Sequence, residues 1–357
     1  MIVKNENQSL ATPVLFLIFN RPALTRQVFD AIRTSRPAKL YIAADGPRQS
    51  VESDLENCMR TRSVVSKVDW ECDVKTLFRE ENLGCGKGVS SAISWFFKHE
   101  PEGIILEDDC LPSADFFPFC TELLNRYRDD KRIMAIGGTN LVPRQLRPDE
   151  YSYSFSNHNN IWGWASWRRA WDLYDYDMSQ YKKIKKLDYL KNNFSSQYEY
   201  DYFQWVFERT FLFPSITWDY QWEFIRRINS GLTIQPQRNL ISNLGFGKGA
   251  THTTNPADKS SKLSLEGIDF PLVHPDYVIV DNRADKAAFI EHYTNFSSRI
   301  KSTAKSLLPK SVRKKLFSTS MERFIQSQKG QFPLTKNSGH HSPYKENWED
   351  HSSANIK

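Results

Sequence analysis

Short apolar runs alternate with segments of helical periodicity through the first 140 residues of this 357-residue chain. Alternation of buried strands with helices is typical of a mostly parallel sheet joined by crossover helices. We therefore predict an α/β fold. The predicted strands are 13–19, 39–44, 74–78, 103–106 and 132–136, and the predicted helices are 24–33, 52–68, 87–98 and 115–128.

Beyond residue 150 the sequence becomes aromatic, polar and rich in loops, with a helix predicted over 202–211. The Gly- and Asn-rich stretch 236–256 has little periodicity and is predicted to be an ordered or substrate-ordered loop. Such a region can form a second lobe that covers a site on the first. The predicted units are a first half at 1–150, a second half at 151–290, a basic amphipathic segment at 291–320 and a polar, disordered tail at 321–357.

Positive charge is concentrated towards the C-terminal end of the chain. The net charge is +6, from 48 Lys and Arg against 42 Asp and Glu. The stretch 292–321 has seven basic residues and no acidic one, so the remainder carries a net charge of −1. A nearly neutral body argues against nucleic acid as a partner. The segment 296–317, interrupted by Pro309, suits either two amphipathic pieces on an anionic membrane or a solvated basic linker.

Cysteine usage and hydropathy indicate the compartment. The five cysteines are odd in number and include no CxxC pair, which argues against a disulfide framework and a cysteine-ligated zinc. The longest apolar run near the start, at 14–19, is about a third of a bilayer span, and no small-residue cleavage site follows it. We therefore expect a cytoplasmic protein, peripheral at the inner face of the plasma membrane if the basic segment binds lipid.

Three acidic residues, Glu107, Asp108 and Asp109, directly follow the strand predicted at 103–106. Ligands of open α/β sheets gather at the carboxyl ends of the strands, and hard divalent cations prefer carboxylate oxygens. One interpretation is therefore a metal ion held by one or two of these carboxylates and by substrate phosphates. The other is a solvated acidic turn or a helix N-cap ahead of 115–128.

Two more strand ends place polar residues at the same predicted edge. Arg21 follows the first strand and Asp45 follows the second. An arginine can clamp a phosphate or stack on a base, and an aspartate can accept hydrogen bonds from a pyrimidine or a ribose. Each is a common turn residue, but their convergence with the acidic triplet favours a nucleotide pocket. Lys87, after Gly84 and Gly86, could face a diphosphate, although the chain has no GxGxxG or P-loop motif.

This layout, continued by a tryptophan-rich segment and a helix start with Trp-Asp, resembles inverting nucleotide-sugar glycosyltransferases of the GT-A fold. It is most similar to the N-acetylglucosaminyltransferase I type and to bacterial relatives found among surface-polysaccharide genes. The resemblance covers roughly residues 13–256 and is strongest at 103–124, where the acidic motif precedes a Pro, an Asp and two Phe. It implies a Rossmann-like, mostly parallel sheet flanked by helices, with an aromatic-rich acceptor lobe.

Carried over by position, the resemblance implies roles for individual residues. Asp109 would ligate Mn²⁺ or Mg²⁺ at the diphosphate, and Glu107 and Asp108 would contact sugar and ribose hydroxyls. The family often has two acids directly before a Trp, whereas here Asp219 stands two residues further from Trp222, which keeps Glu223 as an alternative base. The other implied roles are uridine binding by Arg21 and Asp45, acceptor contacts by Trp162 and Trp164, contacts of a glycine-rich loop with Lys248 and His252 to the donor phosphates, and general base catalysis by Asp219.

The residue types suit glycosyl transfer independently of the resemblance. The leaving diphosphate must be neutralised, which a divalent ion does with help from Lys87 or Lys248. The acceptor hydroxyl must lose a proton as it attacks C1, and one carboxylate suffices for that and for inversion. These residue types predict metal-dependent, inverting transfer. The resemblance further implies a UDP-sugar as donor, with UDP-GlcNAc as a candidate, and a hydroxyl of a glycan or lipid-linked acceptor in surface polysaccharide synthesis.

Other interpretations stay open at this point. A sugar nucleotidyltransferase also uses strand-end acids and Mg²⁺, but normally has a Gly-rich loop where this chain has Asn20-Arg21-Pro22. A catalytically silent glycan-binding protein with the same fold is the second alternative. His158 and His252 are more often hydrogen-bonding loop residues than metal ligands. The tryptophans at 162, 164, 167 and 171 have i, i+3 and i+4 relations, so they could equally form the core stripe of a helix.

Overall fold

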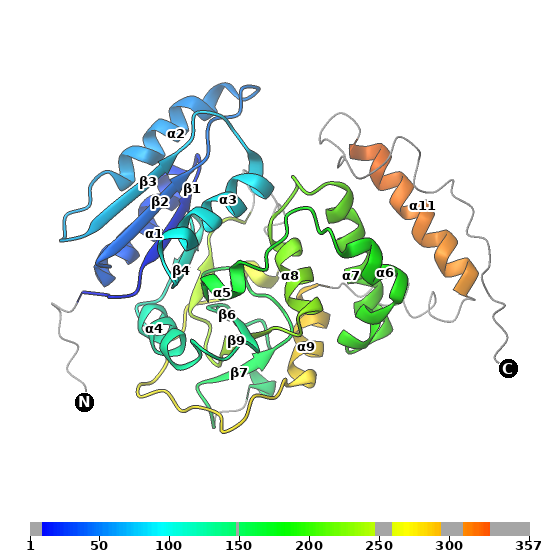
Figure 1. Ribbon diagram of the computed structural model, residues 1–357. Helices are drawn as coiled ribbons and strands as arrows, with labels where there is room; N and C mark the ends of the chain where they lie inside the picture. The colour runs from blue at the N-terminus through cyan, green and yellow to red at the C-terminus, as the bar shows by residue number, and fades with distance from the viewer. Residues whose placement is uncertain (1–8, 148–149, 247–258, 294–309, 329–357) are drawn as a thin grey trace.

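The structure, a computed structural model, describes residues 9–147, 150–246, 259–293 and 310–328. Within these ranges an eight-stranded sheet in the order β3-β2-β1-β4-β8-β6-β9-β7 occupies the centre of the molecule (Figure 1). A separate antiparallel ribbon pairs β5 with β10. The strands are β1 (Val14–Ile18), β2 (Lys39–Ala44), β3 (Asp73–Phe78), β4 (Glu102–Glu107), β5 (Cys110–Pro112), β6 (Ile133–Gly137), β7 (Tyr153–Ser156), β8 (Trp164–Trp167), β9 (Leu232–Pro236) and β10 (Ile241–Asn243).

Six strands of the large sheet point the same way, while β7 and β8 run antiparallel to their neighbours. The predicted α/β fold with a mostly parallel sheet is thus confirmed. Strands of the two predicted halves share this one sheet, because β8 lies between β4 and β6. The helices are α1 (Pro22–Ser35), α2 (Glu52–Val65), α3 (Gly84–His99), α4 (Phe116–Arg126), α5 (Arg168–Trp171), α6 (Tyr181–Leu187), α7 (Gln197–Leu212), α8 (Asp219–Ile228), α9 (Asn282–His292) and α11 (Lys310–Gln328).

Helices cover both faces of the sheet, which explains why its inner strand β1 is apolar throughout. On β1, Val14 and Phe16 pack in one core with apolar residues of α1, α2 and α4. Leu15 and Leu17 pack in a second core with residues of α3, α5, α7 and α8. Successive side chains of a strand point to opposite faces, so a strand between two helical layers must be apolar at every position.

The tryptophan-rich segment forms strand β8 and the short helix α5, and not one helical stripe. Trp164 and Trp167 lie three residues apart on β8 and therefore enter opposite cores. The backbone N–H of Gly138 donates to the carbonyl of Gly163 at 2.8 Å, and this hydrogen bond continues the pairing of β8 with β6. Because both faces of β8 are buried, its tryptophans recur at a three-residue spacing that one face of a helix would also show.

The C-terminal helix α11 corrects the predicted tail. It continues to Gln328, so residues 321–328 are helical, and residues 294–309 and 329–357 lie outside the described ranges. Met321 is fully buried, and the ring of Phe324 contacts those of Trp205 and Phe213 at 5.5 and 5.7 Å. These apolar contacts hold α11 beside α7, as Figure 1 shows.

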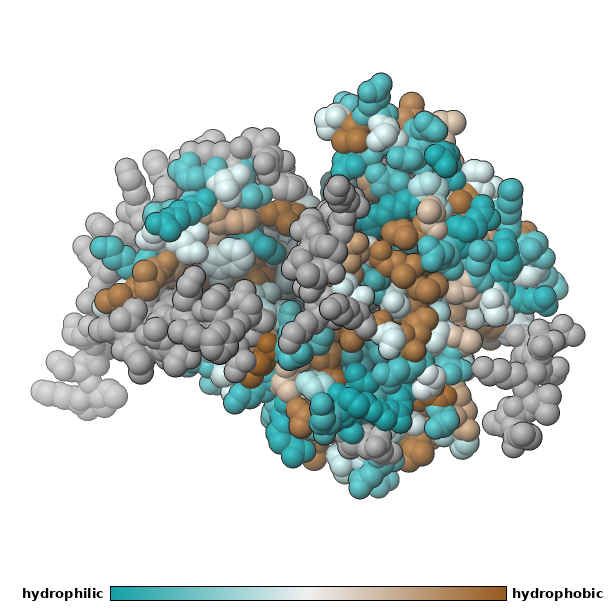
Figure 2. All heavy atoms as spheres, turned by 180° about the vertical axis from the view of Figure 1, so that it is seen from behind, coloured by the Kyte–Doolittle hydropathy of each residue, from teal (hydrophilic) through white to brown (hydrophobic). Residues whose placement is uncertain are grey.

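Most large apolar side chains of the described residues are buried. Viewed from behind, the described surface is largely hydrophilic, with a band of hydrophobic residues near the middle (Figure 2). None of the helices in the described ranges combines the length and the apolar character that crossing a bilayer requires.

Candidate functional site

A cavity of about 460 Å³ lies where strand ends of the large sheet meet the start of α8. The residues that line it come from the ends of β1, β4 and β6, from the turn before β8, and from α7, α8 and α9. It therefore occupies the edge of the sheet at which the sequence predicted a site. Six predicted site residues line it: Arg21, Glu107, Asp109, Trp162, Asp219 and Glu223.

Arg21 is the centre of the ionic contacts at the ends of β1 and β4. Its Nη1 donates to Asp109 Oδ2 at 2.8 Å and to Asp108 Oδ1 at 3.4 Å. The backbone N–H of Phe19 donates to the other oxygen of Asp108 at 3.3 Å. The acids and the arginine were expected at one edge, but the structure pairs them with each other. In this arrangement Arg21 orients the acidic residues.

The acidic residues hold more negative charge than Arg21 balances. Burial raises the pKa of Glu107 to about 8, and the charges of Asp109 and Asp108 add to this rise. Burial, then the charge of Asp109, raises the pKa of Asp108 to about 7, although Arg21 opposes it. Like charges gathered in a partly dry site disfavour ionisation. A bound cation would relieve this repulsion, and both Glu107 and Asp109 line the cavity.

The donor set suits a hard divalent cation that takes its remaining ligands from substrate and water. Mg²⁺ and Mn²⁺ at phosphate sites are commonly held by one or two carboxylates plus phosphate oxygens and waters. No group of three or more His, Cys, Asp or Glu side chains in the described ranges is arranged to hold a metal alone. The carboxylates of Glu107 and Asp109 therefore fit a metal shared with a diphosphate better than a closed protein site.

Backbone pairing brings a distant segment against Asp109. Cys110, the next residue, pairs with Asn243 in the β5–β10 ribbon. The N–H of Leu244 donates to the carbonyl of Asp109 at 2.7 Å. Gly245 follows so closely that a Cβ there would collide with the Asp109 carboxylate. The beginning of the predicted glycine-rich loop thus lies at the acidic motif, whereas Lys248 and His252 lie outside the described residues.

Asp219 is the first residue of α8 and lines the cavity beside Trp218 and Tyr220. The hydroxyl of Thr217 donates to its carboxylate. The carboxylate contributes to the raised pKa of Glu107, after burial and the charges of Asp109 and Asp108, which places it near the acidic motif. A half-buried carboxylate in the wall of the cavity is suited to accept a proton from a substrate hydroxyl.

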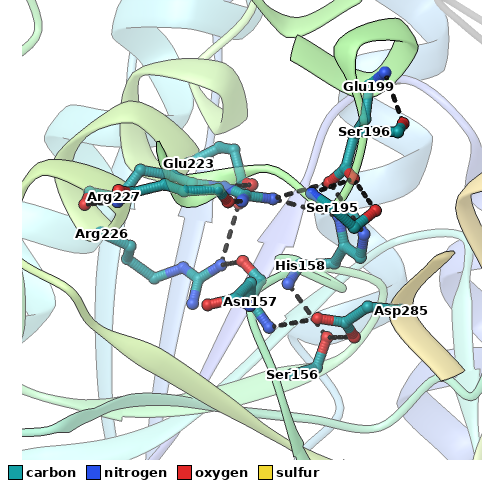
Figure 3. A network of polar contacts seen from close by, with 11 residues as sticks. Ser156, Asn157, His158, Ser195, Ser196, Glu199, Glu223, Arg226, Arg227 and Asp285 are labelled. Carbon is teal, nitrogen blue, oxygen red and sulfur yellow. Dashed lines mark hydrogen bonds and ion pairs between the residues drawn. The ribbon is translucent and has the colours of Figure 1, made fainter. Parts of the chain in front are cut away.

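Glu223 lies one turn further along α8, and its carboxylate is already occupied (Figure 3). Its Oε2 accepts from Arg226 Nη2 at 2.9 Å and its Oε1 accepts from Arg227 Nε at 2.8 Å. Burial alone would raise the pKa of Glu223, but Arg227 and Arg226 outweigh it and the pKa lies below its usual range. Although Glu223 touches the cavity, these contacts favour a structural role.

Figure 3 shows that this ion pair belongs to a larger polar network between α7, α8, α9 and the turn after β7. Arg227 also lies 3.7 Å from Glu199, and its Nη2 is 3.3 Å from Nδ1 of His158. Asp285 accepts from the backbone N–H of Asn157 at 2.8 Å. The network fixes the wall of the cavity on which His158 lies, and it gives the ring of His158 a hydrogen-bonding neighbour in Arg227.

Within the described ranges, four predicted site residues are not among those that line the cavity: Asp108, which Arg21 binds behind the lining, and Asp45, Lys87 and Trp164. Asp45 accepts hydrogen bonds from the N–H groups of Leu83 and Gly84 at 3.0 and 2.9 Å, so its carboxylate caps the start of α3. Lys87 is exposed on the first turn of the same helix. Trp164 is only 1 % exposed and stacks on Trp218 at 5.7 Å, which leaves no ring face for a sugar. The predicted acceptor role is therefore corrected for Trp164, while the donor roles of Asp45 and Lys87 stay predictions.

Trp162 is the tryptophan of the pair that reaches the cavity, where its ring meets that of Phe246 edge to face at 5.7 Å.

Sequence reasoning missed several other lining residues, among them Arg209, Tyr220 and Tyr293. Helix α7 begins at Gln197, five residues before the predicted start. The hydroxyl of Ser196 accepts from the N–H of Glu199, so the Ser-x-x-Glu pattern was the signal that could have extended this helix.

No family model matches the chain, and no curated protein matches it. Solved structures do match parts of it. HddC from Yersinia pseudotuberculosis is 10 % identical, with a TM-score of 0.29 over 44 % of this chain and 77 % of that one. Mouse xyloside xylosyltransferase 1 is 13 % identical, with a TM-score of 0.26 over 45 % of this chain and 68 % of that one. A UDP-glucose pyrophosphorylase complexed with UDP-glucose is 11 % identical, with a TM-score of 0.27 over 46 % and 78 % of the two chains. A xylosyltransferase and a pyrophosphorylase both match, so these likenesses do not separate the two kinds of reaction.

Proposed function

We propose that this chain is a metal-dependent, inverting glycosyltransferase that moves a sugar from a UDP-sugar to a hydroxyl of a glycan or lipid-linked acceptor in surface polysaccharide synthesis. The observation that carries the proposal is the meeting of two kinds of carboxylate in one cavity. Glu107 and Asp109, at the end of β4, offer oxygens for a divalent cation, and Asp219, at the start of α8, offers a separate base.

The residues would divide the work as follows. Asp109, with Glu107 beside it, would hold Mn²⁺ or Mg²⁺, which supplies positive charge against the leaving diphosphate when bound. Arg21 would keep the carboxylate of Asp109 in place through its 2.8 Å hydrogen bond. Asp219 would accept the proton of the acceptor hydroxyl while its oxygen bonds to C1 and the bond from C1 to the diphosphate oxygen breaks. A single displacement of this kind inverts C1.

Metal-dependent nucleotide binding is the first test. UDP with Mn²⁺ should stabilise the wild-type protein, by about 2.7 kcal/mol at 100 times the dissociation constant. UDP without metal should do so much less. Asp109→Asn should lose the metal-dependent part, because it removes a charged ligand and the partner of Arg21. The measurement is the thermal midpoint with UDP, GDP, CMP or dTDP, with and without Mn²⁺.

The control for this experiment is Asp129→Asn, an exposed aspartate after α4, which should behave as wild type. Absence of any nucleotide effect in the wild-type protein would refute the proposal and favour a glycan-binding protein. Pyrophosphate release from UTP and a sugar phosphate would instead identify a nucleotidyltransferase.

A second prediction concerns Gly245. An alanine there would push the Asp109 carboxylate away from its place because the two cannot occupy the same space. Gly245→Ala should therefore weaken binding of UDP with Mn²⁺ by about tenfold, equivalent to 1.4 kcal/mol, as measured by calorimetric titration. Gly267→Ala is the matched control, since a Cβ there would lie 3.3 Å from the nearest side-chain atom, Asp115 Oδ2. Equal affinities for the two variants would show that the space beside Asp109 is not needed.

A further inference from the structure

The cavity contains an arginine whose charge the proposed mechanism does not use. Among the described residues, two arginines line it, Arg21 and Arg209. Arg21 pairs with Asp108 and Asp109, whereas Arg209 has no hydrogen-bond or ion-pair partner in the part of the chain that the structure describes. The Nε of Arg209 is buried without an acceptor. A guanidinium is charged at any physiological pH, and leaving it unpaired in a cavity is costly.

Aromatic rings fix the guanidinium without using its N–H donors. Its central carbon lies 5.2 Å from the ring centroid of Trp205, and 5.8 Å from those of Tyr220 and Phe324. The rings come from three helices, α7, α8 and α11. Contacts between a cation and a ring face are favourable and leave the guanidinium edge available. Arg209 is thus held in place with its hydrogen-bonding capacity unspent.

The position of Arg209 assigns it to the acceptor side of the proposed base. Tyr220, which Arg209 contacts, directly follows Asp219 in α8. Arg209, Asp219 and the acidic motif all line the one cavity. In an inverting displacement the acceptor approaches C1 from the side opposite the diphosphate, which is the side of the base, so a cation that contacts the residue next to the base is available to the acceptor.

We propose that Arg209 recognises an anionic group, a carboxylate or a phosphate, on the acceptor. The inference rests on the proposed function, since it names the class of acceptor for the same site. Carboxylates and phosphates match the planar fork of a guanidinium with two parallel hydrogen bonds. An acidic acceptor would thereby complete the ion pair that the described residues leave open, and a neutral one would leave it open.

The test compares glucose with two sugars that carry an anionic group at C6. Glucuronate, glucose 6-phosphate and glucose are titrated calorimetrically into the full chain with UDP and Mn²⁺ present. At least one anionic sugar should bind about tenfold or more tightly than glucose. Arg209→Met, which retains the apolar stem, should lose about 10- to 100-fold of that affinity. Arg209→Lys retains the charge but not the planar fork, so its affinity for the anionic sugar should lie between those of the wild type and Arg209→Met.

Arg323→Met, at an exposed position of α11, is the matched control and should bind as wild type. A preference for glucuronate or for glucose 6-phosphate identifies a carboxylate or a phosphate as the group. The inference is overturned if, at sugar concentrations up to about 10 mM, both anionic sugars bind no better than glucose. It is also overturned if the Arg209→Met and Arg209→Lys proteins are folded and bind the anionic sugars with wild-type affinity. If anions bind through Arg209 but no nucleotide binds, the proposed function fails while the anion site stands.

Discussion

Replacing Asp219 with Asn should lower the turnover of sugar transfer by about 10²- to 10⁴-fold. The amide keeps the shape of the side chain but cannot take the proton of the acceptor hydroxyl. The acidic motif is untouched, so the affinity for UDP with Mn²⁺ should stay as in wild type. The measurement is the release of UDP from a panel of UDP-sugars with acidic and neutral glycan acceptors, analysed for kcat and KM separately.

Asp172→Asn is the control for this experiment, because Asp172 is exposed at the end of α5 and changes charge in the same way. A drop in affinity for UDP with little change in turnover would assign Asp219 to donor binding instead. Wild-type turnover in Asp219→Asn would remove it from the chemistry and return attention to Glu223.

Replacing Glu223 with Gln should destabilise the fold by about 3 to 5 kcal/mol. Arg226 is fully buried and Arg227 is 4 % exposed, and Glu223 accepts a hydrogen bond from each. The neutral amide would leave two buried guanidinium groups with too little negative charge. The measurement is the free energy of unfolding in urea, with the turnover of the folded fraction recorded alongside.

Glu102→Gln provides the comparison, since Glu102 pairs with Arg128, whose side chain is 53 % exposed, and should cost about 1 kcal/mol or less. Unfolding at low pH should show the contribution of Glu223 to stability in a second way. The folded-state pKa of Glu223 is lowered, so its contribution to stability is present above the pKa of an unfolded glutamate and disappears as the pH falls through the lower folded value. A loss for Glu223→Gln no larger than that for Glu102→Gln would contradict the structural role.

The strand ends were predictable because their geometry follows from local pattern. Apolar runs that end in Arg21 and in the Glu107 triplet must bring these residues to one edge of a parallel sheet, and the structure does so. Asp45 follows a strand in the same way, but its carboxylate turns to the start of α3, which the sequence does not reveal. Arg209 depends on the packing of α7, α8 and α11 around it. Such contacts between distant helices leave no periodic signal along the chain.

The place of β8 in the sheet also bears on how the chain is made. Ile104 and Ile105 on β4 pair with Ala165 and Trp164 on β8, which in turn pair with Ile136 and Gly137 on β6. During synthesis, both β4 and β6 therefore wait with open edges until about residue 167 has left the ribosome. Unpaired apolar edges invite association with other chains. The four residues of β8 thus join β4 to β6 in the nascent sheet, and a chain that stalls before them would leave those two strands unjoined at its centre.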